Sequence, residues 1–181
     1  MSYARILRNE EPRRNPEVKH GMNSSGHPSR RAGIILGLGL GGFVDGILLH
    51  QIVHWHNMGS AVVPPVSMDA MAANMRWDGF FHAAVWLLTL IGVYWLLNDA
   101  RQGEPLPGPR EFTGLLILGW GIFNLVEGII DHEILGLHHV RDLPTHMPLY
   151  DWLFLLIGGV GFLLLGWALS RSALSAYRSR V

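Results

Sequence analysis

Carboxylates and histidines recur in three similar words inside the apolar stretches of this chain. The words DGILLH (45–50), DGFFH (78–82) and EGIIDH (127–132) each set a carboxylate, a glycine and two or three apolar residues before a histidine. An ionisable residue within a membrane span costs at least a few kcal/mol, so it usually faces a bundle interior and marks function. Imidazole and carboxylate together suit divalent transition metals. The three words therefore predict a buried metal site.

Spacing on an α-helix selects the candidate ligands. The pairs His50/His54, Asp78/His82 and Glu127/Asp131 are four residues apart, which places each pair on one helix face. The nine predicted metal ligands are His50, His54, Asp78, His82, Glu127, Asp131, His132, Asp45 and His138. Of these, Asp45 lies ~140° around the helix from His50 and is expected to support a ligand from a different side.

Histidines at the helix ends are less informative. His56 and His139 are explained equally well as ligands or as solvated interfacial side chains. His146, close to Pro148 in a loop, is expected to be solvated.

The number of candidate ligands exceeds what one tetrahedral ion needs. Two ions, or one ion with carboxylates that orient its histidines, both fit the set. The predicted cofactor is a transition-metal ion, with Cu, Zn and Fe all compatible with these donors. A buried network of ion pairs with Arg76 or Arg141, and a proton relay without metal, are the alternatives.

Composition indicates how these residues are positioned. Hydrophobic residues form 49% of the 181, charged residues only 15%, and the mean hydropathy is +0.24. Four apolar stretches, near 32–52, 77–97, 112–135 and 149–169, are each close to the ~20 residues that cross a bilayer. We predict an all-α, polytopic membrane four-helix bundle over residues 32–170. A disordered basic tail, 1–31, is expected before the bundle, and a short tail, 171–181, after it.

Charge places this bundle in the membrane. Seven Lys and Arg precede the first span, while the loops that follow the first and third spans hold one Arg each. The positive-inside rule therefore predicts both termini in the cytoplasm, with the metal site near the outer face of the membrane. Lys plus Arg and Asp plus Glu are equal at 14 each, which gives no reason to expect nucleic acid, and Cys is absent, which excludes thiolate ligands.

The first and third spans are related by a shift of 82 positions. That shift lays Asp45 on Glu127, His50 on His132 and His56 on His138, while a shift of 73 lays Asp78 on Asp151. The chain is therefore predicted to be two tandem helical hairpins in parallel orientation, related by a pseudo-twofold axis along the membrane normal.

The words GGFVDGILLHQIVHWHNM, RWDGFFHAAVW and GWGIFNLVEGIIDHEILGLHHVRD resemble the motifs of a bacterial family of small four-span membrane proteins catalogued as a domain of unknown function. The resemblance extends over about Gly33 to Leu169. It implies the fold and a location in the bacterial inner membrane, with the metal site near the periplasmic face, but no activity. Family members are noted near genes for cytochrome oxidase assembly factors, which implies copper and a respiratory-enzyme assembly partner. The family motifs match here at Asp45, His50, His54, His56, Asp78, His82, Glu127, Asp131, His132, His138 and His139.

Three function classes follow. The first is a protein that binds or delivers a transition metal, copper among them, near the periplasmic face. The second is a membrane metalloenzyme of the hydrolase or oxidase type that acts on a lipid-like substrate, with Glu127 or Asp131 as general base. The third is a haem-binding cytochrome that uses histidine pairs on facing helices. The expected partners are the lipid bilayer and a metal ion, and a homo-oligomer is left open.

Overall fold

Four long helices make up the fold. The computed structural model describes residues 30–178, and the side chains of this part up to residue 171. Within these residues the structure is all-α, with four helices long and apolar enough to cross a membrane: Arg31–Ile52, Met68–Arg101, Pro109–Ile134 and Pro148–Arg171. The predicted fold class is confirmed. Of the predicted tail 1–31, residues 1–29 lie outside the described residues, whereas Arg30 caps the first helix and Arg31 begins it.

Three of the four spans change from α-helix to π-helix along their length. The elements, in chain order, are α1 (Arg31–Asp45), η1 (Gly46–Ile52), α2 (Met68–Arg101), α3 (Pro109–Glu127), η2 (Gly128–Ile134), α4 (Pro148–Leu153), η3 (Phe154–Gly161) and α5 (Phe162–Arg178). A π segment is wound more loosely than an α-helix, and such segments are frequent at functional sites.

The second span begins nine residues earlier than its apolar pattern predicts. The Ser67 side chain accepts a hydrogen bond from the Ala70 backbone N–H, and Asp69 lies in the first turn. A polar cap and an early acidic residue both stabilise a helix start. Met71 and Met75 therefore lie on the first turns of α2 rather than in a loop.

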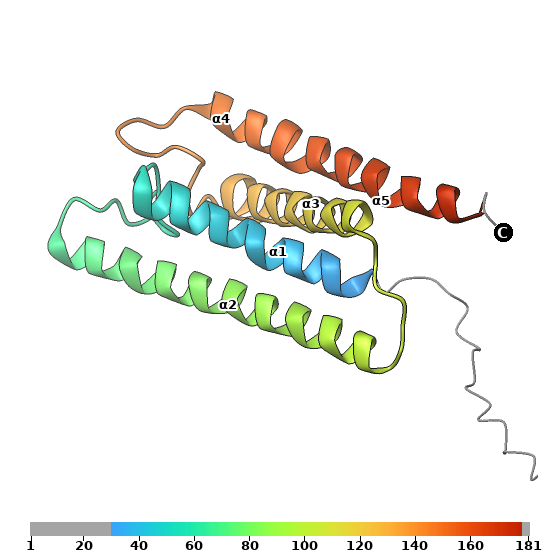
Figure 1. Ribbon diagram of the computed structural model, residues 1–181. Helices are drawn as coiled ribbons and strands as arrows, with labels where there is room; N and C mark the ends of the chain where they lie inside the picture. Colours follow the sequence, from blue (N-terminus) through green and yellow to red (C-terminus); the bar gives the residue numbers. More distant parts are fainter. Residues whose placement is uncertain (1–29, 179–181) are drawn as a thin grey trace, which may run out of the picture.

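The spans are arranged as two hairpins with α1 and α3 in the middle. α1 packs against α2 and α3, and α3 packs against α1 and α5. Figure 1 shows the connections 53–67 and 135–147 at one end of the bundle. We call this the cluster end, and the opposite end, which holds the 102–108 connection, the far end. The start of α1 and the end of α5 both lie at the far end (Figure 1).

Glycines bring α1 and α3 into backbone contact. A Cβ added at Gly37 would meet the backbone of Leu116 and Gly119, and one added at Gly119 would meet the backbone of Ile34 and Gly37. The shift of 82 relates Gly37 to Gly119 and Ile34 to Leu116, so the contact repeats itself across the interface. Small residues at such crossings allow helix backbones to approach closely in lipid.

Hydrogen bonds between the two cluster-end connections obey the same relation. The Ala61 N–H donates to the Leu137 carbonyl oxygen at 3.1 Å, and the Leu143 N–H donates to the Trp55 carbonyl oxygen at 2.9 Å. Each bond is the other shifted by 82 positions with the two hairpins exchanged. The two-hairpin repeat predicted from the sequence is therefore present in the structure.

Two arginines at the start of α1 tie the far end together. Arg30 lies 3.4 Å from Glu111 of α3 and donates to Ser170 of α5 at 2.9 Å. Arg31 pairs with Asp99 of α2 at 2.6 Å. The start of α1 thus contacts each of the other three spans.

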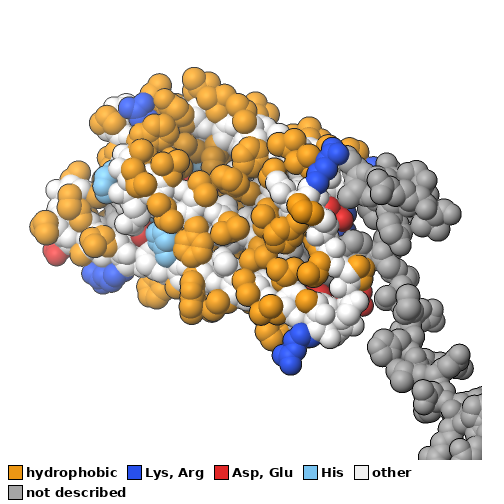
Figure 2. Space-filling view, in the orientation of Figure 1, with side chains coloured by type: hydrophobic (Ala, Val, Ile, Leu, Met, Phe, Trp, Pro, Cys, Tyr) orange, Lys and Arg blue, Asp and Glu red, His pale blue; other side chains and the backbone are white. Residues whose placement is uncertain are grey.

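The molecular surface fits a lipid environment. Figure 2 shows one face covered mainly by apolar side chains, with Lys and Arg side chains toward its ends. Exposed apolar residues along the spans include Leu87, Tyr94, Leu156, Leu164 and Trp167. Contiguous apolar patches this large are rare on soluble monomers, so the surface supports a membrane-embedded bundle.

Replacing Gly37 by Ala will destabilise the bundle because the added methyl group meets the backbone of α3. Such overpacking costs about 1–3 kcal/mol. We expect a lower Tm in detergent by thermal unfolding. Gly79→Ala is the matched control, since nothing lies within 4 Å of a Cβ at that helical position. Equal Tm values for the two variants would show that α1 and α3 are not held together at Gly37.

Candidate metal centre

The π segments align each buried carboxylate with a histidine five residues later. Asp45 and His50 flank the start of η1, and Glu127 and His132 flank the start of η2. Because a π-helix forms i→i+5 hydrogen bonds and holds more residues per turn than an α-helix, it brings residues five apart nearer to one side than an α-helix would. Asp45 Oδ2 lies 3.1 Å from His50 Nε2. The expectation that Asp45 points away from His50 is wrong, since it assumed α-helical geometry.

Two further histidines reach the same place from the connections. His56 and His138 are both fully buried, and their rings stack with centroids 4.5 Å apart. His56 Nδ1 donates to the Val140 carbonyl oxygen at 2.9 Å, and His138 Nδ1 donates to the Met58 carbonyl oxygen at 3.3 Å. A carbonyl oxygen can only accept, so these bonds fix the tautomer and leave each Nε2 with a free lone pair.

The loop histidine His138 is held in its neutral form. Burial, followed by the nearby His56 and His132, lowers the pKa of His138 well below its usual range. A neutral imidazole is the form that binds a metal ion.

Asp78 orients the histidine of the first span. Its Oδ1 lies 3.0 Å from His50 Nδ1 and accepts the Met58 N–H at 2.8 Å, while Oδ2 accepts from Asn57 Nδ2 at 2.7 Å. Asp78 therefore lies behind His50, on the side away from Asp45, and supports that histidine instead of sharing its ligand face. Histidines that bind metals commonly have a carboxylate in this position.

Asp151 repeats this arrangement in the second hairpin. Its Oδ1 lies 3.5 Å from His132 Nδ1 and accepts the Val140 N–H at 2.8 Å. Met58 and Val140, the two backbone donors, are themselves related by the shift of 82. Each span histidine thus has its own carboxylate from the neighbouring helix.

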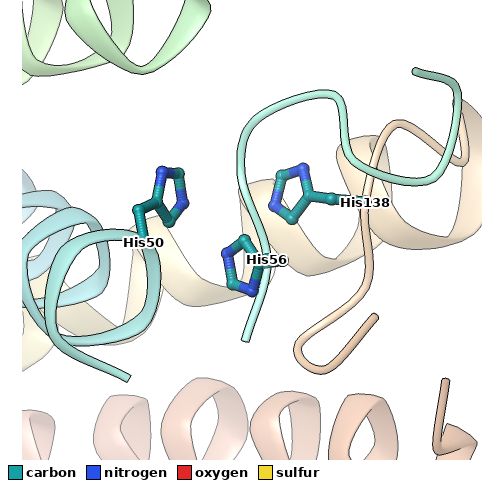
Figure 3. A group of neighbouring side chains, drawn as sticks. All are labelled: His50, His56 and His138. Atoms are coloured by element: carbon teal, nitrogen blue, oxygen red, sulfur yellow. The ribbon is translucent and has the colours of Figure 1, made fainter. Parts of the chain in front are cut away.

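Six of these residues form what we call the central cluster: Asp45, His50, His56, Glu127, His132 and His138. All six are buried, none more than 5% exposed. Two groups of three, His50/His56/His138 and Glu127/His132/His138, hold donor atoms within 4.8 Å of one another. Figure 3 shows the rings of His50, His56 and His138 gathered close together.

Most inward-facing atoms of the central cluster lie outside any hydrogen bond, and Asp45 Oδ2 and His50 Nε2, although 3.1 Å apart, are not hydrogen-bonded. Unpartnered buried atoms include Asp45 Oδ2, both Glu127 carboxylate oxygens, both His132 nitrogens and the Nε2 atoms of His50, His56 and His138. Leaving one such group unsatisfied costs about 1–3 kcal/mol, and more if it is charged. Nitrogen and oxygen lone pairs that converge in this way are arranged as they would be around a cation.

Arginine does not balance these carboxylates in the described part of the chain. The ion pairs of Asp45, Asp78, Glu127 and Asp151 are all with histidines. The two arginines proposed as partners from the sequence point elsewhere. Arg76 donates to the Ala72 carbonyl oxygen, and Arg141 lies over the rings of Trp55 and Tyr150.

Four predicted ligands lie outside the central cluster. Asp78 supports His50 from behind, and the other three are His54, His82 and Asp131. His54 falls beyond the end of η1 at Ile52, so it does not share a face with His50. His82 lies on α2, where its Nδ1 donates to the Asp78 carbonyl oxygen at 2.7 Å. Asp131 is half-buried and belongs to neither three-donor group, because the π turn brings His132 under Glu127 instead.

A cavity of about 530 Å³ opens beside the central cluster on the first-hairpin side. Its lining combines apolar and polar residues: His50, Gln51, His54, Asn57, Pro65, Met71, Met75, Asp78, Gly79, His82 and Leu143. His54 and His82, which are missing from the central cluster, are part of this wall. The cavity therefore connects the outside of the bundle with His50 and Asp78.

Sequence reasoning missed two residues of the candidate site. His56 was left undecided, and Asp151 was noted only as the match of Asp78. The repeat already contained the signal, because the shift of 82 pairs His56 with His138 and the shift of 73 pairs Asp151 with Asp78. Applying the repeat to every candidate would have selected both.

Fold and site together define a four-span membrane protein whose two hairpins enclose a buried cluster of histidines and carboxylates. The chain belongs to the family described as "Predicted membrane protein (DUF2243)", whose model matches residues 32–173. This confirms the resemblance seen in the motifs. No curated protein and no solved structure matches the chain.

His54 adopts a left-handed backbone conformation, with φ of 50°, at the position where the second hairpin has Gly136 with φ of 56°. For a non-glycine residue this left-handed conformation costs on the order of 1–2 kcal/mol. Part of that cost is offset because glycine loses more backbone entropy on folding. We expect His54→Gly to raise the free energy of unfolding slightly in denaturant titrations, and Gly136→Ala to lower it by about 1 kcal/mol. A clear loss of stability in His54→Gly would show that the histidine ring supports the fold.

Proposed function

We propose that this membrane protein holds two divalent transition-metal ions at the central cluster. The observation that carries the proposal is the convergence of buried, unpartnered nitrogen and oxygen donors from both hairpins. Each hairpin supplies one carboxylate, one span histidine and one loop histidine. The repeat pairs Asp45, His50 and His56 with Glu127, His132 and His138, and this doubled set of ligands supports two ions.

Charge balance supports the same number. The centre contains four buried carboxylates, Asp45, Asp78, Glu127 and Asp151, whose partners are histidines. Uncompensated charges are expensive inside a bundle in lipid. Two divalent cations neutralise four carboxylates while the imidazoles stay neutral. Two buried carboxylates that orient histidines also match the outer partners of known metal sites.

The donor set limits the identity of the ions. Imidazole nitrogen with carboxylate oxygen suits Zn(II), Cu(II) and Fe. Copper is favoured only by the family resemblance, and the thioether side chains of Met71 and Met75 line the cavity. We therefore propose a metal-binding protein that stores ions or delivers them to an acceptor, with the metal to be named by analysis.

The geometry offers no support for haem. The stacked His56 and His138 rings are 4.5 Å apart, which leaves no space for a macrocycle between them. Two carboxylates also face the imidazoles in the same buried volume.

Removing one span histidine should remove metal from the purified protein. Protein prepared without a histidine tag is expected to contain about two ions of Cu, Zn or Fe per chain by elemental mass spectrometry. We expect His50→Ala and His132→Ala each to lose about one ion or more, because each takes one donor from a symmetric half.

His82→Ala is the matched control for this experiment. It removes an imidazole from the same end of the bundle without touching either three-donor group, so it should keep the full metal content. Full content in both His50→Ala and His132→Ala would show that the ligand assignment is wrong. Wild-type protein that stays metal-free after incubation with each ion would point to a proton-relay network.

The cavity favours a second candidate function, a membrane metalloenzyme that acts on an amphipathic substrate. Small-molecule sites are typically ~300–1,000 Å³, mostly apolar, with a few placed polar groups, and this cavity of about 530 Å³ fits that description. His82 Nδ1 is occupied by a carbonyl oxygen, so its Nε2 is left to accept a hydrogen bond from a substrate hydroxyl group. His50 and Asp78 form the part of the wall nearest the proposed ions.

Binding in the cavity should be visible at the metal. In Co(II)-loaded protein, 1-decanol is expected to shift the visible absorption bands through contact with Asp78 and His50, whereas decane is not. Met75→Trp should abolish the shift by filling the cavity, with an unchanged cobalt content. A shift with both probes, or with neither, would remove the support for a substrate site.

A further inference from the structure

A second group of ligand-type residues lies in the 135–147 connection. His139, Asp142 and His146 hold donor atoms within 4.8 Å of one another. The rings of His139 and His146 are 4.1 Å apart. His146 is exposed and the other two are half-buried, so this group, which we call the outer cluster, is open to the surrounding solution.

The repeat shows that the fold does not require these residue types. The positions 82 residues earlier are Asn57, Ser60 and Pro64. In the first hairpin, the Asn57 side chain donates to the carboxylate of Asp78. In the second hairpin, His139 Nδ1 lies 3.4 Å from the carboxylate of Asp151. The amide of Asn57 is thus sufficient to orient the carboxylate of Asp78. His139, at the equivalent position, adds a second ring nitrogen that can bind a metal.

The outer cluster is preorganised by its neighbours. Asp142 Oδ2 accepts the Ser60 hydroxyl hydrogen at 2.6 Å and the His139 backbone N–H at 3.3 Å. These bonds hold the carboxylate beside the two imidazoles. His139 Nδ1 is buried without a hydrogen-bond partner, which is costly unless a ligand or a closer approach to Asp151 satisfies it.

Asp151 connects the outer cluster to the central cluster. Its Oδ2 lies 3.4 Å from His139 Nδ1, and its Oδ1 lies 3.5 Å from His132 Nδ1. One carboxylate therefore lies between a solvent-accessible histidine and a buried ligand candidate. The central cluster itself is at most 5% exposed, so any ion that occupies it must pass through a route at its edge.

We propose that His139, Asp142 and His146 form an exchangeable site for a divalent transition-metal ion, from which ions are loaded into the central cluster. Two imidazoles and one carboxylate provide three ligands, and water completes the coordination in an open site. Binding at the outer cluster stands on its own residues, whereas the loading step rests on the proposed metal centre. An open site with fewer protein ligands binds more weakly and exchanges faster than the buried centre.

His146→Ala tests the proposal with little disturbance of the fold, because the side chain is exposed and its ring contacts His139 alone among the described aromatic rings. Metal-free full-length protein is titrated with Co(II), and loading is followed by stopped-flow visible absorbance. We expect His146→Ala to lose one weakly bound equivalent of Co(II) and to keep the wild-type number of tightly bound ions. Loading should be slower by at least about tenfold, the lower end of the range found when a residue that supports a metal site is mutated.

His54→Asn is the matched control. It also removes one exposed imidazole at the cluster end, and asparagine tolerates the left-handed conformation found there. It should load at the wild-type rate. Slower loading in His54→Asn but not in His146→Ala would assign the route to the cavity and overturn the proposal.

The remaining outcomes separate the two proposals. If His146→Ala keeps every equivalent and loads normally while His50→Ala loses metal, the outer site is wrong and the metal centre stands. If His146→Ala loses an equivalent while His50→Ala and His132→Ala lose none, the outer site stands and the metal centre is wrong. Wild-type protein that binds no Co(II) or Zn(II) overturns both.

Discussion

The cluster end of this protein is governed by the burial of four carboxylates within a bundle that crosses a membrane. Asp45, Asp78, Glu127 and Asp151 are each at most 5% exposed and face histidines, with no described Lys or Arg beside them. Negative charge in this setting needs a cation or protons, since lipid and helix interiors solvate it poorly. The π turns, the inward-folded connections and the glycine contacts all bring these carboxylates together. A fold that holds them this close therefore requires cations or protons to neutralise their negative charge.

Neither hairpin can form the centre alone. His56 of the first connection is held by the Val140 carbonyl oxygen of the second, and His138 of the second by the Met58 carbonyl oxygen of the first. The backbone bonds of Ala61 and Leu143 cross between the connections in the same exchanged manner. The proposed metal ligands and their supports therefore come from both halves. Ion binding at this place would be coupled to association of the two hairpins, which lipid packing alone drives only weakly.

Most of the fold follows from sequence patterns, and part of the site does not. Apolar length gives the four spans, and the repeat gives the twofold relation between Asp45, His50 and Glu127, His132. What the sequence did not reveal is which residues share a helix face. The i,i+4 spacing of an α-helix grouped His50 with His54, whereas the π segments bring together residues five apart. The π segments lie where helices pack closely, as Gly128 does against Leu155, and no local pattern in one sequence reports such packing. The early start of α2 was missed for a simpler reason, because a Ser67 cap carries no apolar signal.

The differences between the halves are as informative as the repeat. Equivalent positions carry the same ligand chemistry at the central cluster but diverge around it: His82 corresponds to Leu155, His54 to Gly136, and Asn57 to His139. The first hairpin consequently has a cavity walled by histidines and methionines, and the second has the outer cluster. A symmetric centre needs neither, since Leu155 and Gly136 satisfy the packing and the backbone at their positions. A centre that only held the bundle together would not account for these differences between the two hairpins. A centre that holds ions accounts for them, because the outer cluster would then exchange metal on one side and the cavity would receive an organic molecule on the other.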